Sequence, residues 1–198
     1  MDASLYRWFN SLADRTQWLH PMGVAYAKFG VGLLVLLLLL GAWLIVRREE
    51  TEEQGFARMA GVAWAGLSAV VALGLNQVIG KLVGRARPYT AMPAAHVLIA
   101  RTHDFSFPSD HACVMGAVAA GLWLVDRRLG IAAGVAALAM AVARVYVGVH
   151  YPGDVLAGLV VGGAVAAIGW IPARWFLVPA VRWIARTPAG VLVYSGRS

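Results

Sequence analysis

The block from Val31 to Val46 contains only apolar residues and glycine, and it constrains the fold more than any other feature of the chain. A bilayer core about 30 Å thick requires about 20 apolar residues in each helical span. Extended back to Met22, the block is long enough for one, with Lys28 near its start, where a long side chain reaches the interface. Because 60% of all residues are hydrophobic and only 14% are charged, neither a soluble nor a disordered chain fits. We therefore expect an integral membrane protein.

Four further apolar segments follow this first span. The only charge that interrupts the last three is Arg144; the four segments are Phe56–Gly80, Ala112–Val125, Leu129–Val149 and Val155–Ala173. The sequence thus predicts an all-α fold, a polytopic transmembrane helix bundle with about five spans, and a single domain over residues 1–198. The fifth span is rich in glycine, which predicts close helix packing at Gly158, Gly162, Gly163 and Gly169.

Two amphipathic segments flank the spans. Residues 3–19 combine apolar side chains at helical spacing with charged ones, which favours a helix lying in the membrane interface over a disordered tail. Residues 174–186 contain tryptophans and arginines, and we expect a second interfacial segment there. The first twenty residues carry Asp2 and Asp14 and do not resemble a cleavable signal peptide.

The basic residues predict the orientation. With the spans above, nine of them fall on one side of the membrane and eight on the other, and three of the eight are assigned below to a phosphate site, which leaves five. The positive-inside rule then places the loops of Arg47–Arg58 and Arg127–Arg128 in the cytoplasm, together with the C-terminal arginines Arg174, Arg182, Arg186 and Arg197. The segment 81–111 and the turn near His150 would face outward.

Chemically reactive side chains gather at the ends of these spans. The long connection begins with Lys81, Arg87 and Pro88 and closes with Pro108, Ser109 and His111, while Arg144, His150 and Asp154 lie between the fourth and fifth spans. An arginine within a span indicates a functional site by default. If the third and fourth spans form a hairpin, both groups emerge at the same membrane face.

This combination of side chains favours binding of an anion over binding of a metal ion. Two histidines and one carboxylate beside three cations would repel a divalent metal ion, whereas arginine makes forked contacts with phosphate and lysine adds a compact charge. The single cysteine, Cys113, excludes an intramolecular disulfide and a cysteine-based metal site. The net charge of +7 forms no continuous basic stripe, so we expect no nucleic-acid partner.

The motifs resemble those of the PAP2 (type 2 phosphatidic acid phosphatase) superfamily, in which Lys…Arg-Pro, Pro-Ser-Gly-His and Ser-Arg-x5-His-x3-Asp follow in this order. Residues 81–154 contain all three, with departures. Five residues instead of six separate Lys81 from Arg87, so that Arg85 competes for the cationic role. Ala143 replaces the serine of the third motif, and Asp110 replaces the glycine of the second, a variant that resembles bacterial undecaprenyl-diphosphate phosphatases.

The resemblance implies a role for each motif residue. His150 would be the nucleophile that forms a phosphohistidine, Asp154 would accept the proton on the other ring nitrogen, and His111 would protonate the leaving oxygen and then activate water. The phosphate oxygens would be bound by Lys81, Arg87, Ser109 and Arg144. No metal and no other cofactor is expected.

Several of these residues have simpler alternative roles. Asp154 and Ser109 are also good helix N-caps, and Arg144 could extend to the interface. Asp110 is either a first-turn acid favoured by the helix dipole or a substrate-selecting group. His96 and His103 match none of the motifs and are predicted to be loop histidines.

The expected function is hydrolysis of undecaprenyl diphosphate to undecaprenyl phosphate in a bacterial inner membrane, with lipid phosphate and membrane lipids as partners and no particular oligomeric state. Phosphatidylglycerophosphate, phosphatidate or another polyprenyl phosphate are alternative substrates. Transfer to an acceptor other than water would use the same residues. A non-enzymatic protein that binds or transports lipid phosphates is the alternative of another class.

Overall fold

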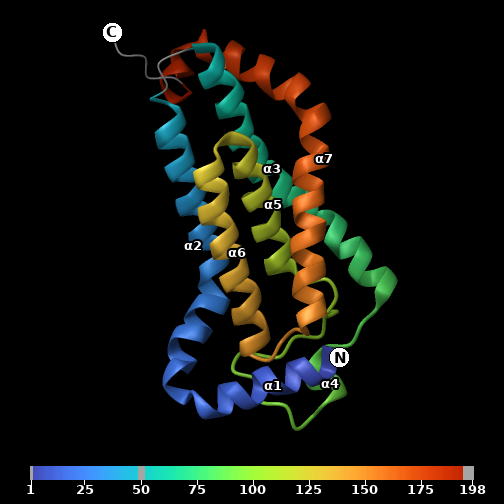
Figure 1. Ribbon diagram of the computed structural model, residues 1–198. Coiled ribbons are helices and arrows are strands. Elements are labelled where there is room, and N and C mark those ends of the chain that lie inside the picture. Colours follow the sequence, from blue (N-terminus) through green and yellow to red (C-terminus); the bar gives the residue numbers. More distant parts are fainter. Residues whose placement is uncertain (1, 49–51, 194–198) are drawn as a thin grey trace.

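The computed structural model describes residues 2–48 and 52–193, and in that part of the chain every regular element is a helix. Arg197, which the predicted orientation counts among the cytoplasmic arginines, lies outside the described residues. Figure 1 shows the elements in order: α1 (Asp2–Arg15), η1 (Gln17–Leu19), α2 (His20–Val46), α3 (Glu52–Val83), α4 (Pro88–Ala91), α5 (Asp110–Val125), α6 (Arg127–Tyr146), α7 (Pro152–Ala185) and η2 (Pro188–Leu192).

The predicted spans correspond to five of these helices. Within the described residues, α2, α3, α6 and α7 are long and apolar enough to cross a membrane. The remaining helix, α5, has 16 residues, fewer than the roughly 20 that a span requires, and it lies in the middle of the bundle among the longer helices (Figure 1). The all-helical membrane fold is therefore confirmed, with one span shorter than a bilayer.

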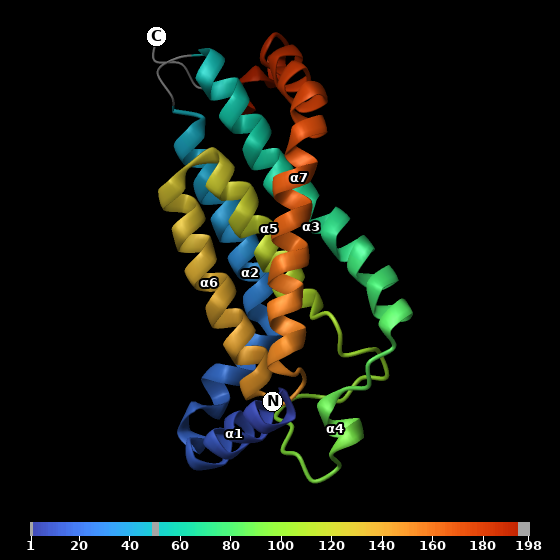
Figure 2. The same cartoon turned by 45° about the vertical axis from the view of Figure 1, so that its right-hand side comes forward.

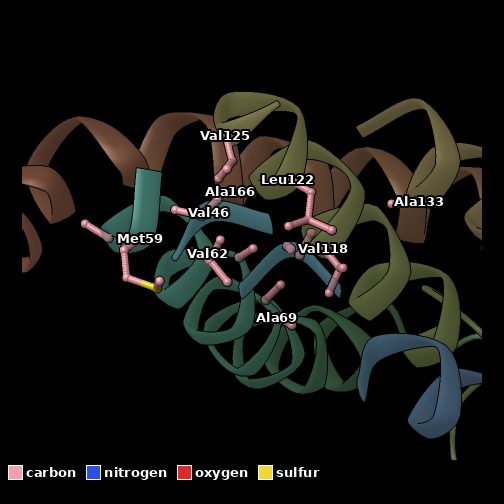
Figure 3. Packing of buried hydrophobic residues seen from close by; sticks show 14 of the residues in the cluster. Val46, Met59, Val62, Ala69, Val118, Leu122, Val125, Ala133 and Ala166 are labelled. Atoms are coloured by element: carbon pink, nitrogen blue, oxygen red, sulfur yellow. The ribbon is translucent and has the colours of Figure 1, made fainter. Parts of the chain in front are cut away.

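The bundle turns its large apolar side chains outward and its small ones inward. Along α2, Leu33, Leu36 and Leu37 are more than half exposed, whereas the core between α3, α5 and α7 contains mostly alanine, valine and an occasional leucine (Figure 3). Water would oppose such a surface, but hydrocarbon chains do not. Small residues let the helix backbones approach closely, which is how helices associate in a membrane.

The closest approach is that of α7 to α5. A Cβ atom added at Gly162 would lie 1.9 Å from the carbonyl oxygen of Cys113, and one at Gly158 would lie 2.6 Å from that of Ser109. Both positions therefore require glycine. The predicted packing role is confirmed at these two glycines, and their packing brings the second motif against the third.

Two ends of the bundle differ. At one end, α1 lies across the bundle beside α4 and the loop that follows it (Figures 1 and 2). Tyr6 Oη of α1 donates a hydrogen bond to the carbonyl of Gly148 at 3.0 Å, and Asn10 bonds to the backbone of His96, which lies in the loop as predicted. The amphipathic N-terminal helix is thus present and attached to the segment that contains His150.

At the other end, residues 174–186, for which the sequence predicts an interfacial segment that anchors the last span, form the last turns of α7. Helix α7 continues without interruption to Ala185 although Pro172 and Pro179 lie inside it, and its last turns bend over the end of the bundle (Figure 1). Proline removes one backbone donor and bends a helix, but neighbouring helices allow membrane helices to continue through it. The tryptophans and arginines of this segment therefore belong to the end of a span.

Candidate active site

Four of the predicted residues meet in one cavity of about 300 Å³ at the end of the bundle covered by α1. The α5–α6 hairpin brings the start of α5 beside the end of α6, so the expectation that both groups emerge at one face is confirmed. The lining comprises the predicted residues Arg87, His111, Arg144 and His150, the ambiguous Asp110, and also Lys28, Ile99, Ala100, Thr102, Asp104 and Val149.

His150 lies in the short connection between α6 and α7 and is 2% exposed. Its Nδ1 lies 2.8 Å from the carbonyl oxygen of Ser106, which can only accept, so Nδ1 carries the proton and Nε2 keeps its lone pair. Nη1 of Arg87 lies 3.3 Å from Nε2. Burial lowers the pKa of His150 and outweighs the opposite effect of Asp154, while Arg144 and Arg87 lower it further. These effects favour the neutral ring, with the lone pair of Nε2 directed toward Nη1 of Arg87.

Asp154 is fully buried and accepts three hydrogen bonds at the start of α7. Its Oδ1 accepts from Arg85 at 2.7 Å, and its Oδ2 accepts from the hydroxyl of Ser106 and from the backbone N–H of Tyr151 at 2.9 Å. The Tyr151 contact is a capping interaction, so the N-cap alternative is present in part. Nδ1 of His150 is 3.8 Å from Oδ2, and the direct hydrogen bond expected there is made by the Ser106 carbonyl instead.

Ser106 thus links the two residues, and the sequence analysis did not single it out. It donates through its hydroxyl to Asp154 and accepts through its carbonyl from His150. The available signal was a hydroxyl residue two positions before Pro108, next to a predicted motif. The carboxylate therefore orients the loop that orients the ring, and its negative charge remains within ion-pair distance of the imidazole.

Arg87 is buried and already holds a carboxylate. It forms a two-pronged ion pair with Asp104, with N–O distances of 3.0 and 2.8 Å, and donates to the carbonyl of Val149. Partial burial raises the pKa of Asp104, but hydrogen bonds from Arg87 and Thr102 outweigh it and hold the pKa at about 2. Asp104 was also missed, although it is one of only two acidic residues between Lys81 and His111. Its carboxylate occupies the guanidinium group that the family resemblance assigns to phosphate.

Arg144 and Ser109 present buried polar atoms without partners. Arg144 is 7% exposed and donates through Nη1 to the carbonyl of Ala27 at 3.2 Å, while its Nε has no partner among the described residues. The alternative that Arg144 extends to the interface is therefore wrong. Ser109 occupies the N-cap position of α5, but its buried hydroxyl caps nothing and bonds to no described residue. Arg144 lines the cavity, where a bound anion would supply the missing partner, whereas Ser109 is not among the residues that line it.

Neither Lys81 nor Arg85, the two candidates for the cation of the first motif, lines the cavity. Lys81, in the last turn of α3, is exposed and lines a neighbouring space of about 170 Å³ that also contains Asp104 and Asp110. Arg85 is held between Asp154 and Asp2, at 2.7 and 2.6 Å. The third cation on the cavity wall is instead Lys28, which the sequence analysis interpreted as an interfacial anchor.

Asp110 opens α5 and lines both spaces. Its Oδ1 accepts hydrogen bonds from the amides of Asn76 at 2.7 Å and Gln77 at 2.9 Å, which joins α5 to α3. In residues 2–48 and 52–193, no three histidine, cysteine or acidic side chains are close enough together to hold a metal ion. Three cations and two histidines around one space suit a phosphate group.

Comparisons with known proteins agree with this chemistry. The sequence model described as the PAP2 superfamily matches residues 61–176. The chain is 27% identical to an undecaprenyl-diphosphatase of Bacillus subtilis over 81% of this chain and 78% of that protein. It is 36% identical to a decaprenylphosphoryl-5-phosphoribose phosphatase of Mycobacterium tuberculosis over 72% of each. A solved structure of a PAP2-type phosphatidylglycerolphosphate phosphatase from Bacillus subtilis superposes with a TM-score of 0.61 at 21% identity, covering 85% of both chains.

Proposed function

Because this chain belongs to the PAP2 superfamily and is a multi-pass membrane lipid phosphatase, we propose that it releases the terminal phosphate of undecaprenyl diphosphate and leaves undecaprenyl phosphate. The supporting observation is the buried His150, whose Nδ1 is held by the Ser106 carbonyl and which lines one cavity together with the cationic side chains of Arg87, Arg144 and Lys28. Two relatives whose names specify polyprenyl-linked substrates support a polyprenyl chain.

In the proposed reaction, Nε2 of His150 attacks the terminal phosphorus. The bond from phosphorus to the bridging oxygen breaks, and its electron pair leaves with the lipid monophosphate, which His111 protonates. Water then attacks the phosphorus of the resulting phosphohistidine and passes its proton to His111. The bond from phosphorus to Nε2 breaks, its electron pair returns to Nε2, and inorganic phosphate is released. General acid–base help of this kind contributes about 10²–10⁴-fold to the rate.

The surrounding residues would stabilise charge in both steps. Nδ1 of His150 keeps its proton on the Ser106 carbonyl, and Asp154 at 3.8 Å offsets the positive charge that the ring gains. Arg87 and Arg144 would neutralise the equatorial oxygens as charge spreads over them. For Arg87 this requires that the phosphate displace Asp104 from the guanidinium group. Ser109 and Lys81 remain proposed phosphate donors, and Asp110 a proposed substrate-selecting group.

The proposal includes the location of the protein and its orientation in the membrane. A single domain over residues 1–198 would lie in a bacterial inner membrane with its catalytic cavity outward, where a carrier lipid is released after transfer of its cargo. The basic loops on the opposite side support this orientation.

Phosphate release from the detergent-solubilised full chain tests the activity. We expect release from undecaprenyl diphosphate in the presence of EDTA and slower release from phosphatidylglycerophosphate and phosphatidate. Strong inhibition by EDTA would contradict the metal-free reaction, and equal rates on all three lipids would contradict the polyprenyl substrate. A protein that binds these lipids but releases no phosphate would be a binding or transport protein instead.

A labelled terminal phosphate tests the intermediate. The reaction is stopped rapidly with alkali instead of acid, because alkali preserves phosphohistidine. The label should then remain on the wild-type chain and be absent from His150→Ala. His111→Gln should lower turnover by about 10²–10⁴-fold, because both steps lose their acid–base group. Label retained in His150→Ala would assign the nucleophile to another residue.

A further inference from the structure

Lys28 is one of two lysines in the chain, and its position in a span is unusual. It lies eight residues into α2 and lines the cavity that contains His150. Among the described residues it forms no ion pair with a carboxylate. A charged side chain within a span indicates a function by default, and a lysine that only extends to the interface would not need to border this cavity.

Small residues on α2 bring Lys28 to the site. A Cβ atom at Gly23 would lie 3.1 Å from the ring of Tyr146, so α2 and α6 approach closely there. One turn further, the carbonyl of Ala27 accepts a hydrogen bond from Nη1 of Arg144 at 3.2 Å. The residue after Ala27 is therefore fixed beside Arg144, with a side chain long enough to follow the cavity wall.

The cavity has an inner and an outer part. His150, Arg87 and Arg144 are at most 7% exposed, whereas Lys28 is exposed and is followed by Phe29, which is 71% exposed on the lipid-facing surface. A phosphorus atom attacked by Nε2 of His150 must lie in the inner part. The polyprenyl chain must leave toward the lipid, so the portion of the head group nearest the chain passes the outer part.

We propose that Lys28 binds the lipid-proximal phosphate of a polyprenyl diphosphate and so makes the protein prefer diphosphates to monophosphates; this inference rests on the proposed function. When the bond between the terminal phosphorus and the bridging oxygen breaks, the electron pair moves to that oxygen, and negative charge develops on the departing lipid monophosphate before His111 protonates it. The ammonium group of Lys28 stabilises this charge. A lipid monophosphate has no phosphate at this position, so its hydrolysis gains nothing from Lys28.

Paired substrates test the preference. The detergent-solubilised full chain is assayed on farnesyl diphosphate and farnesyl monophosphate, and kcat/KM is compared for Lys28→Met, Lys28→Arg and the control Arg15→Gln, at an exposed position of α1. Lys28→Met should lower kcat/KM on the diphosphate by about 10-fold to 100-fold, as expected for loss of a hydrogen bond between charged groups. On the monophosphate the change should stay within about threefold. Lys28→Arg should keep the preference and Arg15→Gln should match the wild type.

The outcomes separate this inference from the proposed function. An active wild type with an unchanged substrate ratio in Lys28→Met, or with equal losses in Lys28→Met and Lys28→Arg, overturns the role of Lys28 only. A wild type that releases no phosphate from the diphosphate overturns the proposed function itself. If Lys28→Met does not purify as a monodisperse protein, Lys28→Gln removes the same charge and is judged by the same ratio.

Discussion

Replacing Arg85 by glutamine tests how the protein controls its nucleophile. Arg85 does not line the catalytic cavity, but it donates to the buried Oδ1 of Asp154 at 2.7 Å and to Asp2 at 2.6 Å. Its guanidinium group also lies 4.0 Å above the ring of Tyr151. The substitution therefore removes the positive charge that compensates Asp154, and it leaves the cavity wall as it is.

The expected loss of stability is modest. A hydrogen bond between charged groups contributes about 1.5–3 kcal/mol, but Arg85 is 31% exposed, so solvent screening reduces its share to about 1–2 kcal/mol. Asp154 keeps its hydrogen bonds from Ser106 and Tyr151. In a chain of this length, 1–2 kcal/mol corresponds to a decrease in Tm of about 2–8 °C, which leaves a folded enzyme to assay.

The kinetic consequence has a definite sign. His150 must be neutral to attack, and burial together with Arg144 and Arg87 lowers its pKa, while Asp154 opposes them. Without Arg85, the negative charge of Asp154 is less compensated and favours the protonated ring, so the pKa of His150 should rise. The acid limb of the profile of kcat/KM against pH should then move to higher pH, while the rate on the plateau changes little.

The assay is phosphate release from solubilised protein between pH 4 and 9, with Arg15→Gln as the control. An arginine that only stabilises the fold would lower Tm and leave the acid limb unchanged. An acid limb that stays in place, or moves to lower pH, in Arg85→Gln would therefore refute the electrostatic link from Arg85 through Asp154 to His150.

Two further predictions concern the ion pair of Arg87 with Asp104 and the packing of α7 against α5. Asp104→Asn removes the carboxylate that competes with the substrate for Arg87. Because this ion pair contributes about 1 kcal/mol, KM should fall about fivefold. A higher KM would show instead that Asp104 helps to bind the substrate. Gly162→Ala places a methyl group 1.9 Å from the carbonyl of Cys113 and should destabilise the fold by about 1–3 kcal/mol or more, whereas Gly163→Ala, with its nearest neighbour at 3.9 Å, should be tolerated. Equal thermal stability of the two variants would contradict the α5–α7 contact.

Most of the fold could be predicted because length and polarity determine where a chain can cross a bilayer. The block Val31–Val46 predicts α2, and the glycines of the fifth span predict close helix packing, which the structure shows against α5 at Gly158 and Gly162. The end of α7 could not be predicted in this way. Its tryptophans and arginines indicate an interfacial position, but the tertiary contacts of the bundle decide whether the helix continues through Pro172 and Pro179.

The part of the site that could be predicted consists of residues whose spacing along the chain matches the family motifs. Arg87, His111, Arg144 and His150 converge because the hairpin of α5 and α6 returns the chain to the same end. Lys81 does not join them. It lies at the end of α3 with one residue fewer before Arg87 than the family pattern has, and one residue turns a helical side chain by about 100°.

The remaining residues of the site were beyond the sequence because they act through contacts between distant segments. Ser106 and Asp104 depend on how a loop folds back onto the α6–α7 connection, and nothing in a single sequence encodes that path. Lys28 is 116 residues from Arg144 and reaches the cavity only because Gly23 allows α2 to pack against α6. The third cation of the cavity can therefore come from a span that is distant from the motifs in sequence, because the residues that pack this span against its neighbour are small.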